Sequence, residues 1–205
     1  MTLLIDGVES GMHPEDAQLV DKAQGGDLAA FNLIVERYQA HVFNLSARIL
    51  GNRTTAEDIT QETFISAYRA IKKFRGGSLR SWLLSIAANA SRDFLRSSRR
   101  RPEQSVDESL LNPGFQVASR DESPEQQALR VELGAEIQRA ILTLPTDQRT
   151  VLVLIDVQGL SYEEAAESTG ASLGTVKSRL NRPRGRVRDY LRNHPELLPD
   201  EFRQI

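Results

Sequence analysis

Apolar residues recur at three- and four-residue steps along most of the chain, which is the spacing of helices that bury one face. Asp27 is expected to cap a long helix at residues 28–50, and Gly51 is expected to end it. On the third helix, expected at residues 55–73, the predicted inward stripe includes Tyr68. In the N-terminal half the pattern predicts helices at residues 14–24, 28–50, 55–73 and 81–101.

The C-terminal half shows the same periodicity, and prolines mark where its helices begin and end. Pro124 suits the first turn of a helix, and Pro145 stops that helix. Its apolar stripe is predicted to include Leu129. Thr146 begins a further helix, which continues until Gly159. All of the elements expected in this half are therefore helical.

The last two helices of this half form a recognisable pair. Ser161 and Ser172 are placed to act as N-caps, and Gly170 supplies a tight turn between the two helices. Val176 and Leu180 stripe the inner side of the longer helix, whose outer side is polar. A short helix that supports a second helix in this way is the geometry of a helix-turn-helix, which enters a DNA major groove.

Between the two halves, residues 102–123 are rich in proline, serine and acidic residues and have no sustained period, which is typical of a linker. The fold class is therefore predicted as all-α, with two small helical domains at residues 14–101 and 124–192 joined by a flexible linker. Residues 1–13 and 193–205 are expected to be tails. A linker of roughly 20 residues spans about 70 Å when extended, so both a closed and an open arrangement are within reach.

Positive charge is concentrated on the last helix. Seven basic residues and one acid lie between Lys177 and Arg192, in a chain whose net charge is −2. Such a concentration indicates a surface that binds phosphate. A solvated surface helix is the other interpretation, but charged surface helices usually interleave the two signs.

A second basic region surrounds a glycine-containing loop after the third helix. Lys73, Arg75 and Arg80 lie around the single aromatic residue Phe74. Positive charge beside a ring suits a single-stranded nucleic acid, although an ordinary connection between helices is equally compatible. The fourth helix ends in more arginines than its dipole requires, which favours a phosphate track that includes Arg96, Arg99 and Arg100.

A polar face on the third helix carries Glu57, Asp58, Gln61 and Glu62. A solvated face and a docking patch for a basic partner are both open interpretations. A metal or acid–base site is disfavoured, because no histidine accompanies these residues. The chain has no cysteine and only three scattered histidines, so no catalytic residue, metal site or cofactor is predicted.

No apolar run approaches the roughly 20 residues of a membrane span, and the N-terminus lacks the basic segment of a secretory signal. We therefore expect a cytoplasmic protein without membrane insertion.

Several motifs from both halves occur in a fixed order: Ala56–Phe64, Trp82-Leu83, Ile86–Asn89, Leu144-Pro145, Gln148-Arg149, Gly159–Ala166 and Gly174–Leu180. Together they resemble the extracytoplasmic-function (ECF) group of bacterial sigma-70 family sigma factors. The resemblance covers roughly residues 14–101 and 124–191. It implies a protein that binds core RNA polymerase and directs promoter recognition, promoter melting and transcription initiation, and that is not an enzyme.

The resemblance also implies partners and roles for particular residues. Asp58, Gln61 and Glu62 would dock on the clamp helices of the beta-prime subunit, and the beta flap is a second expected contact on core polymerase. The minus-ten element of promoter DNA would be read by Lys73, Phe74, Arg75, Arg80, Asn89, Arg92, Arg96, Arg99 and Arg100. The minus-thirty-five element would be read by Ser172, Thr175, Lys177, Ser178, Arg179, Asn181 and Arg182. An anti-sigma factor is the expected inhibitor.

One stretch departs from the family, in which this helix is usually unbroken. Pro183 removes a backbone donor and costs roughly 3 kcal/mol or more inside a helix, and Gly185 adds about 1 kcal/mol. The sequence therefore predicts a kink or a helix end near residues 181–183, which would change the direction of Arg184 and Arg186.

Two other classes of protein fit the sequence less well than a sigma factor does. A stand-alone helix-turn-helix transcriptional regulator would bind a two-fold symmetric duplex without polymerase, and the acidic third helix fits that role poorly. A small enzyme is disfavoured because no spacing of a nucleophile and a base is found.

Overall fold

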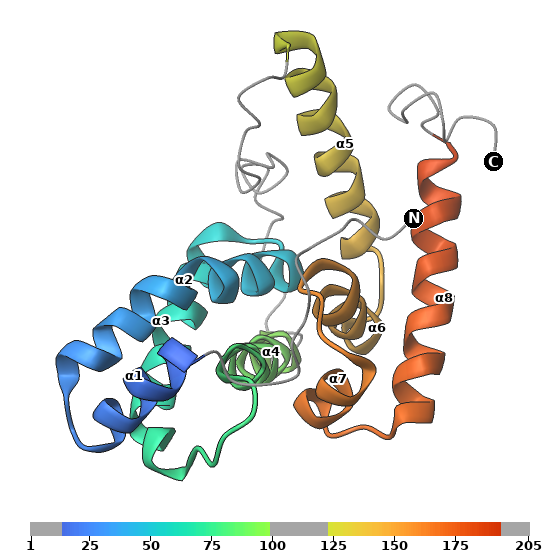
Figure 1. Ribbon diagram of the computed structural model, residues 1–205. Helices are drawn as coiled ribbons and strands as arrows, with labels where there is room; N and C mark the ends of the chain where they lie inside the picture. The colour runs from blue at the N-terminus through green and yellow to red at the C-terminus, as the bar shows by residue number, and fades with distance from the viewer. Residues whose placement is uncertain (1–13, 99–122, 194–205) are drawn as a thin grey trace.

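The computed structural model describes residues 14–98 and 123–193, and every regular element in these ranges is a helix. The N-terminal half contains α1 (Pro14–Gln24), α2 (Leu28–Leu50), α3 (Arg53–Ala70), the short 3₁₀ turn η1 (Ile71–Lys73) and α4 (Leu79–Ser98) (Figure 1). These helices confirm the predicted ones to within a few residues. The predicted tails at 1–13 and 194–205, residues 102–122 of the predicted linker, Arg99 and Arg100 lie outside the described residues.

The C-terminal half contains α5 (Pro124–Leu142), α6 (Thr146–Leu152), the π-helical turn η3 (Val153–Val157), α7 (Tyr162–Thr169) and α8 (Leu173–Leu191). The helix expected from Thr146 thus changes to a wider turn over its second half. In Figure 1, α5 and α8 extend to the same side of the molecule, while α7 lies beside α4 of the other half.

Local signals end these helices as the sequence predicts. The Asp27 carboxylate accepts hydrogen bonds from the backbone N–H groups of Ala29 and Ala30. Gly51 follows α2 with a φ of 70°, a left-handed conformation that favours glycine. Ser161 and Glu164 form a reciprocal capping box at the start of α7. The helix ends are therefore specified by nearby residues, independently of how the helices pack.

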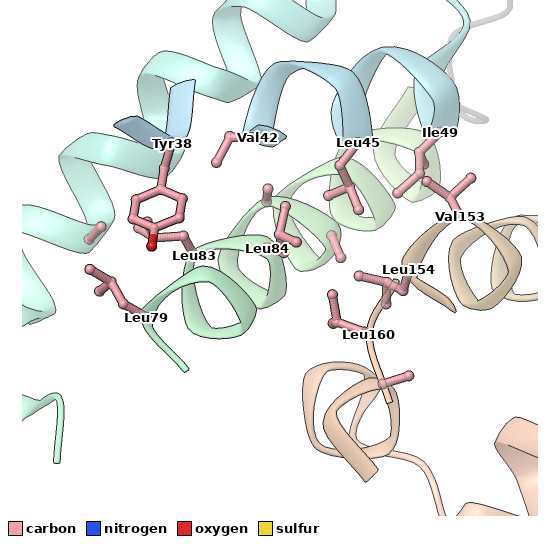
Figure 2. Packing of buried hydrophobic residues seen from close by; sticks show 14 of the residues in the cluster. Tyr38, Val42, Leu45, Ile49, Leu79, Leu83, Leu84, Val153, Leu154 and Leu160 are labelled. Atoms are coloured by element: carbon pink, nitrogen blue, oxygen red, sulfur yellow. The ribbon is translucent and has the colours of Figure 1, made fainter. Parts of the chain in front are cut away.

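The core joins the two halves of the chain. Figure 2 shows Val42, Leu45 and Ile49 of α2 facing Leu83 and Leu84 of α4. Side chains from the C-terminal half complete this cluster from the other side, and they include Val153, Leu154 and Leu160. The two halves therefore share one continuous hydrophobic core in this structure.

The junction between α2 and α5 is equally close. A Cβ atom placed on Gly51 would lie 2.7 Å from Cδ2 of Leu142. Glycine at this position thus both ends α2 and leaves room for a side chain of the C-terminal half.

A buried carboxylate fixes α1 on α2. Asp16 accepts a hydrogen bond of 2.5 Å from the Tyr38 hydroxyl and one of 2.7 Å from Arg37. Burial, and then the bond to Asp16, raise the pKa of Tyr38 well above its ordinary value, so the phenol stays protonated. Arg37 also donates to the exposed Glu15, at 2.7 Å.

We expect Asp16→Ala to lower the free energy of unfolding by about 2–3 kcal/mol, because it leaves the buried Tyr38 hydroxyl without its acceptor and leaves Arg37 with the exposed Glu15 as its remaining carboxylate. Glu15→Ala is the matched control, since Glu15 binds the same arginine at the same distance but is exposed. Its expected cost is below about 0.5 kcal/mol. Urea denaturation of both variants measures the difference, and equal losses would contradict this account.

Two expectations about individual positions are wrong. Tyr68 does not face the core: it is 43% exposed, although its ring contacts Phe31 edge-on. Leu129 is also exposed. Periodicity places both residues on the apolar face of a helix, but within residues 14–98 and 123–193 the neighbouring elements leave these two side chains partly uncovered.

Of the two outcomes predicted near Pro183, the helix end is wrong, because α8 continues from Leu173 to Leu191 with Pro183 inside it, whereas the kink stays a prediction. Pro183 is buried, so its ring contributes to packing even though it cannot donate to the carbonyl of Arg179. Tertiary contacts thus outweigh the local cost of proline.

Candidate nucleic-acid and polymerase interfaces

The outer side of the helix-turn-helix forms a polar surface along α8. Lys177, Ser178, Asn181 and Arg182 are exposed, whereas Val176 and Leu180 on the opposite side are fully buried. The structure therefore brings together four of the residues predicted to read the minus-thirty-five element.

The Ser178 hydroxyl donates to the backbone oxygen of Thr175 at 2.9 Å, and the other three residues of that predicted set also have partners within the protein. The Ser172 hydroxyl accepts a hydrogen bond from the backbone N–H of Thr175, at 3.2 Å, and also lies 2.9 Å from its hydroxyl. These two residues hold the start of α8. Arg179 forms an ion pair with Asp147 at 3.1 Å.

The residues predicted to read the minus-ten element are divided between the surface and the interior. Lys73 and Arg75 are exposed beside a loop in which Gly76 and Gly77 have positive φ. Asn89 and Arg96 are exposed on α4. These four positions are accessible to a nucleic acid in this arrangement of the protein.

Phe74 and Arg80 are held by contacts within the protein in the closed arrangement, in which the two halves pack against each other. The Phe74 ring is 8% exposed and packs against Trp82, with ring centroids 5.1 Å apart. Arg80 donates to the side-chain oxygen of Gln158 at 3.2 Å, and burial lowers the pKa of its guanidinium. Neither side chain can contact a base without a rearrangement.

Two arginines from the two predicted DNA surfaces share one carboxylate. Arg92 of α4 lies 3.4 Å from one oxygen of Asp147, and Arg179 of α8 lies 3.1 Å from the other. Arg92 also donates to the backbone oxygen of Thr169 at 3.5 Å. Asp147 thus links the N-terminal half to the recognition helix.

Further hydrogen bonds cross the same boundary. The Ser81 hydroxyl donates to Glu164 at 2.5 Å, so this carboxylate serves both the α7 capping box and the contact between the halves. Arg149 donates across the boundary to the backbone oxygen of Ile49 at 2.6 Å, and within its own half to that of Leu142, also at 2.6 Å. Because apolar and polar contacts coincide here, this closed arrangement is well packed.

The N-terminal half also carries an apolar groove between α2 and α3. It has a volume of about 880 Å³, and its lining includes Leu28, Ile65 and Tyr68, which are all exposed. Gln61 and Glu57 add polar groups to the lining. A groove of this kind on a protein surface marks a binding site for a partner.

The structure separates the three residues predicted to dock on polymerase. Gln61 lies in the groove, whereas Glu62 faces a different cleft, between α3 and α4. Asp58 is exposed on α3, four residues before Glu62. The apolar part of this surface, which includes Ile65 and Leu28, was not predicted, because helical periodicity does not show where two helices leave a groove between them.

Comparison with known proteins agrees with this geometry. Residues 34–101 match Sigma-70 region 2, and residues 134–186 match Sigma-70 region 4. The chain is 40% identical over 174 residues to the RNA polymerase sigma-H factor of Pseudomonas aeruginosa, covering 83% of this chain and 90% of that protein. It is 38% identical over 192 residues to the ECF RNA polymerase sigma factor SigE of Mycolicibacterium smegmatis, covering 92% and 72%.

Solved structures show the same architecture. The structure of CnrH in complex with the cytosolic domain of CnrY matches with a TM-score of 0.60 and 27% identity, covering 86% of this chain and 97% of that chain. The sigma factor RpoE of Bartonella quintana, solved with the anti-sigma factor NepR, matches in fold with a TM-score of 0.61 at 24% identity, covering 78% and 96%.

The fold and the family models define a class of helical DNA-binding protein with two sigma-70 regions, of which region 4 carries the helix-turn-helix. The chain belongs to the ECF group of the sigma-70 family of RNA polymerase sigma factors. It is accordingly an alternative sigma factor that directs transcription initiation, and sigma factors are initiation factors, not enzymes. In the parts of the chain that the structure describes, no helix is both long and apolar enough to traverse a bilayer.

Proposed function

We propose that this sigma factor docks on core RNA polymerase through α3 and the adjacent groove, reads the minus-ten element with α4 and the loop before it, and reads the minus-thirty-five element with α8. The observation that carries this proposal is the placement of two basic surfaces on two halves of the chain, with an acid-bearing helix on the N-terminal half. The proposed modules are residues 14–101 and 124–192, and they act without catalytic chemistry of their own.

The proposed docking face combines charge with apolar contact. Asp58 and Glu62 supply exposed carboxylates on α3, and Gln61 connects them to the groove. A basic helix of the beta-prime clamp could pair with the carboxylates while its apolar side chains enter the groove. Since core polymerase and promoter DNA are the proposed partners, the protein would act in the cytoplasm.

On duplex DNA, we assign Lys177, Ser178 and Asn181 to base edges and Arg182 to phosphate. The assignment is supported by their exposure on one side of α8. Base contacts specify a sequence, whereas phosphate contacts position the protein. Each good bidentate base contact is worth about 1–3 kcal/mol of discrimination.

Promoter binding requires the closed arrangement to open. Minus-ten and minus-thirty-five elements lie, as their names give, about 25 base pairs apart, which is roughly 85 Å of duplex at about 3.4 Å per base pair. In the closed arrangement, Arg92 and Arg179 both lie within 3.4 Å of Asp147. An anti-sigma factor is a proposed partner that would keep the halves together, as NepR and the cytosolic domain of CnrY form complexes with similar proteins.

Charge reversal on α3 tests the docking proposal. We expect the double variant Asp58→Arg/Glu62→Arg to bind purified core polymerase about tenfold more weakly and to lose promoter-dependent run-off transcripts, because like charges replace attraction. The matched control is Asp21→Arg/Glu132→Arg, which makes the same change in net charge at exposed positions of α1 and α5. Its transcripts should equal those of the wild type.

The same experiment separates the sigma factor from a stand-alone regulator. A wild-type protein that fails to bind core polymerase, yet binds duplex DNA alone in a salt-sensitive manner, would overturn the proposal. Equal binding of core polymerase by both double variants would instead reject α3 as the docking face.

A further inference from the structure

Arg184 follows directly after Pro183 on α8 and makes a bidentate contact with Asp156. Its Nε donates to one carboxylate oxygen at 2.9 Å, and its Nη2 donates to the other at 2.5 Å. The Tyr162 hydroxyl lies 3.5 Å from Nη1. These bonds raise the pKa of Arg184, and the guanidinium is therefore directed toward its own domain.

Asp156 lies on an element that is packed into the core, so its contact with Arg184 restrains α8. Asp156 lies in the π-helical turn η3, whose Val153 and Leu154 are fully buried in the shared core. Asp156 itself is exposed at the surface of that turn. The ion pair therefore connects the far part of α8 to a firmly packed element.

The far part of α8 needs such a connection. Pro183 has no N–H to donate to the carbonyl of Arg179, so the hydrogen-bond ladder of the helix is interrupted at this point. Gly185 follows two residues later and increases the freedom of the backbone. The bidentate contact lies between these two weak positions.

We propose that Arg184 is a positioning residue, which with Asp156 holds α8 in one line across Pro183 so that the exposed residues before and after the proline reach the same stretch of minus-thirty-five DNA. This inference rests on the proposed function of α8 as the reader of that element. It removes Arg184 from the candidate phosphate contacts of the helix. Arg182 and Arg186, which are exposed, remain candidates.

The variant Asp156→Asn tests the proposal by the sign of its effect. If Arg184 were a phosphate contact restrained by Asp156, releasing it and removing one negative charge would strengthen DNA binding. As a positioning pair, the loss of Asp156 should weaken binding of holoenzyme to a promoter duplex about fivefold, the size expected for a partly exposed bidentate pair. Fluorescence anisotropy of a labelled promoter measures this change.

A second substitution tests whether the loss of DNA affinity in Asp156→Asn depends on Pro183. The double variant Asp156→Asn/Pro183→Ala restores the backbone donor of α8, so the pair is no longer needed and affinity should return to that of Pro183→Ala alone. Tighter or unchanged binding by Asp156→Asn would overturn the proposal. If Asp156→Asn weakens binding and the added Pro183→Ala does not restore it, the pair contributes to the general stability of the domain. That result would also overturn the proposal.

Failure of the underlying function gives a different result. Arg182→Gln serves as the reference, because this exposed arginine is proposed to bind phosphate and should reduce the slope of log affinity against log salt by about 0.9. If the wild-type holoenzyme does not distinguish a promoter with a minus-thirty-five element from one without it, the assignment of α8 fails. In that case, any change in DNA affinity caused by Asp156→Asn is not a change in recognition of the minus-thirty-five element.

Discussion

Ile65→Arg is expected to weaken the binding of core RNA polymerase by roughly 100-fold, equivalent to about 3 kcal/mol. Ile65 lies in the groove between α2 and α3 and is 45% exposed, so arginine can be accommodated without disturbing the core. In a complex the same position would be desolvated, and a charge without a partner there is strongly unfavourable. Because α3 bears Asp58 and Glu62, added positive charge also opposes a basic partner.

Leu33→Arg is the matched control for this prediction. Leu33 is 51% exposed on α2 but does not line the groove. The two variants thus introduce the same side chain at two similarly exposed apolar positions of the same domain. Titration of labelled core polymerase should show wild-type affinity for Leu33→Arg. Equal affinities for both variants would mean that the groove is not part of the docking face.

Energy transfer between dyes on the two halves should fall almost to zero when the holoenzyme binds a promoter. The chain has no cysteine, so Asp21→Cys on α1 and Glu167→Cys on α7 provide unique attachment sites at exposed positions. In the free protein, shared packing and the contacts of Asp147 keep the halves together. On DNA, the two elements are roughly 85 Å apart, so the two halves and their dyes must separate widely.

A pair of dyes within the N-terminal half provides the control. Asp21→Cys and Ser97→Cys are both exposed and belong to α1 and α4, which move together in this account. Their energy transfer should stay constant in the free protein, with core polymerase and on the promoter. High transfer for the first pair in a transcriptionally active promoter complex would show that opening is not required.

The helices and their ends are predictable because the information is local. Asp27, Ser161 and Ser172 accept backbone hydrogen bonds at the starts predicted for them. The end of α8 is the exception, because the cost of Pro183 can be estimated from the sequence while its burial cannot. The same limit explains Tyr68: periodicity identifies an apolar face, but only the packed structure shows whether another element covers it.

The candidate site was predictable in composition and much less so in arrangement. The basic residues of α8 are evident from charge alone, and two of them, Lys177 and Arg182, lie exposed together with Ser178 and Asn181 as the sequence implies. Nothing local indicates that Arg92 and Arg179 meet at Asp147, since these residues are far apart in the chain and belong to different halves. Contacts between domains depend on the complete surfaces of both.

The arginines held by Asp147 also affect how the protein is distributed in a cell. A chromosome offers an enormous excess of non-specific sites, and any freely exposed basic surface is titrated by bulk DNA. With Arg92 and Arg179 paired internally to Asp147, the unbound protein presents fewer positive groups to the chromosome. A larger fraction of it therefore stays free to encounter polymerase, and the cost of opening is met only after that encounter.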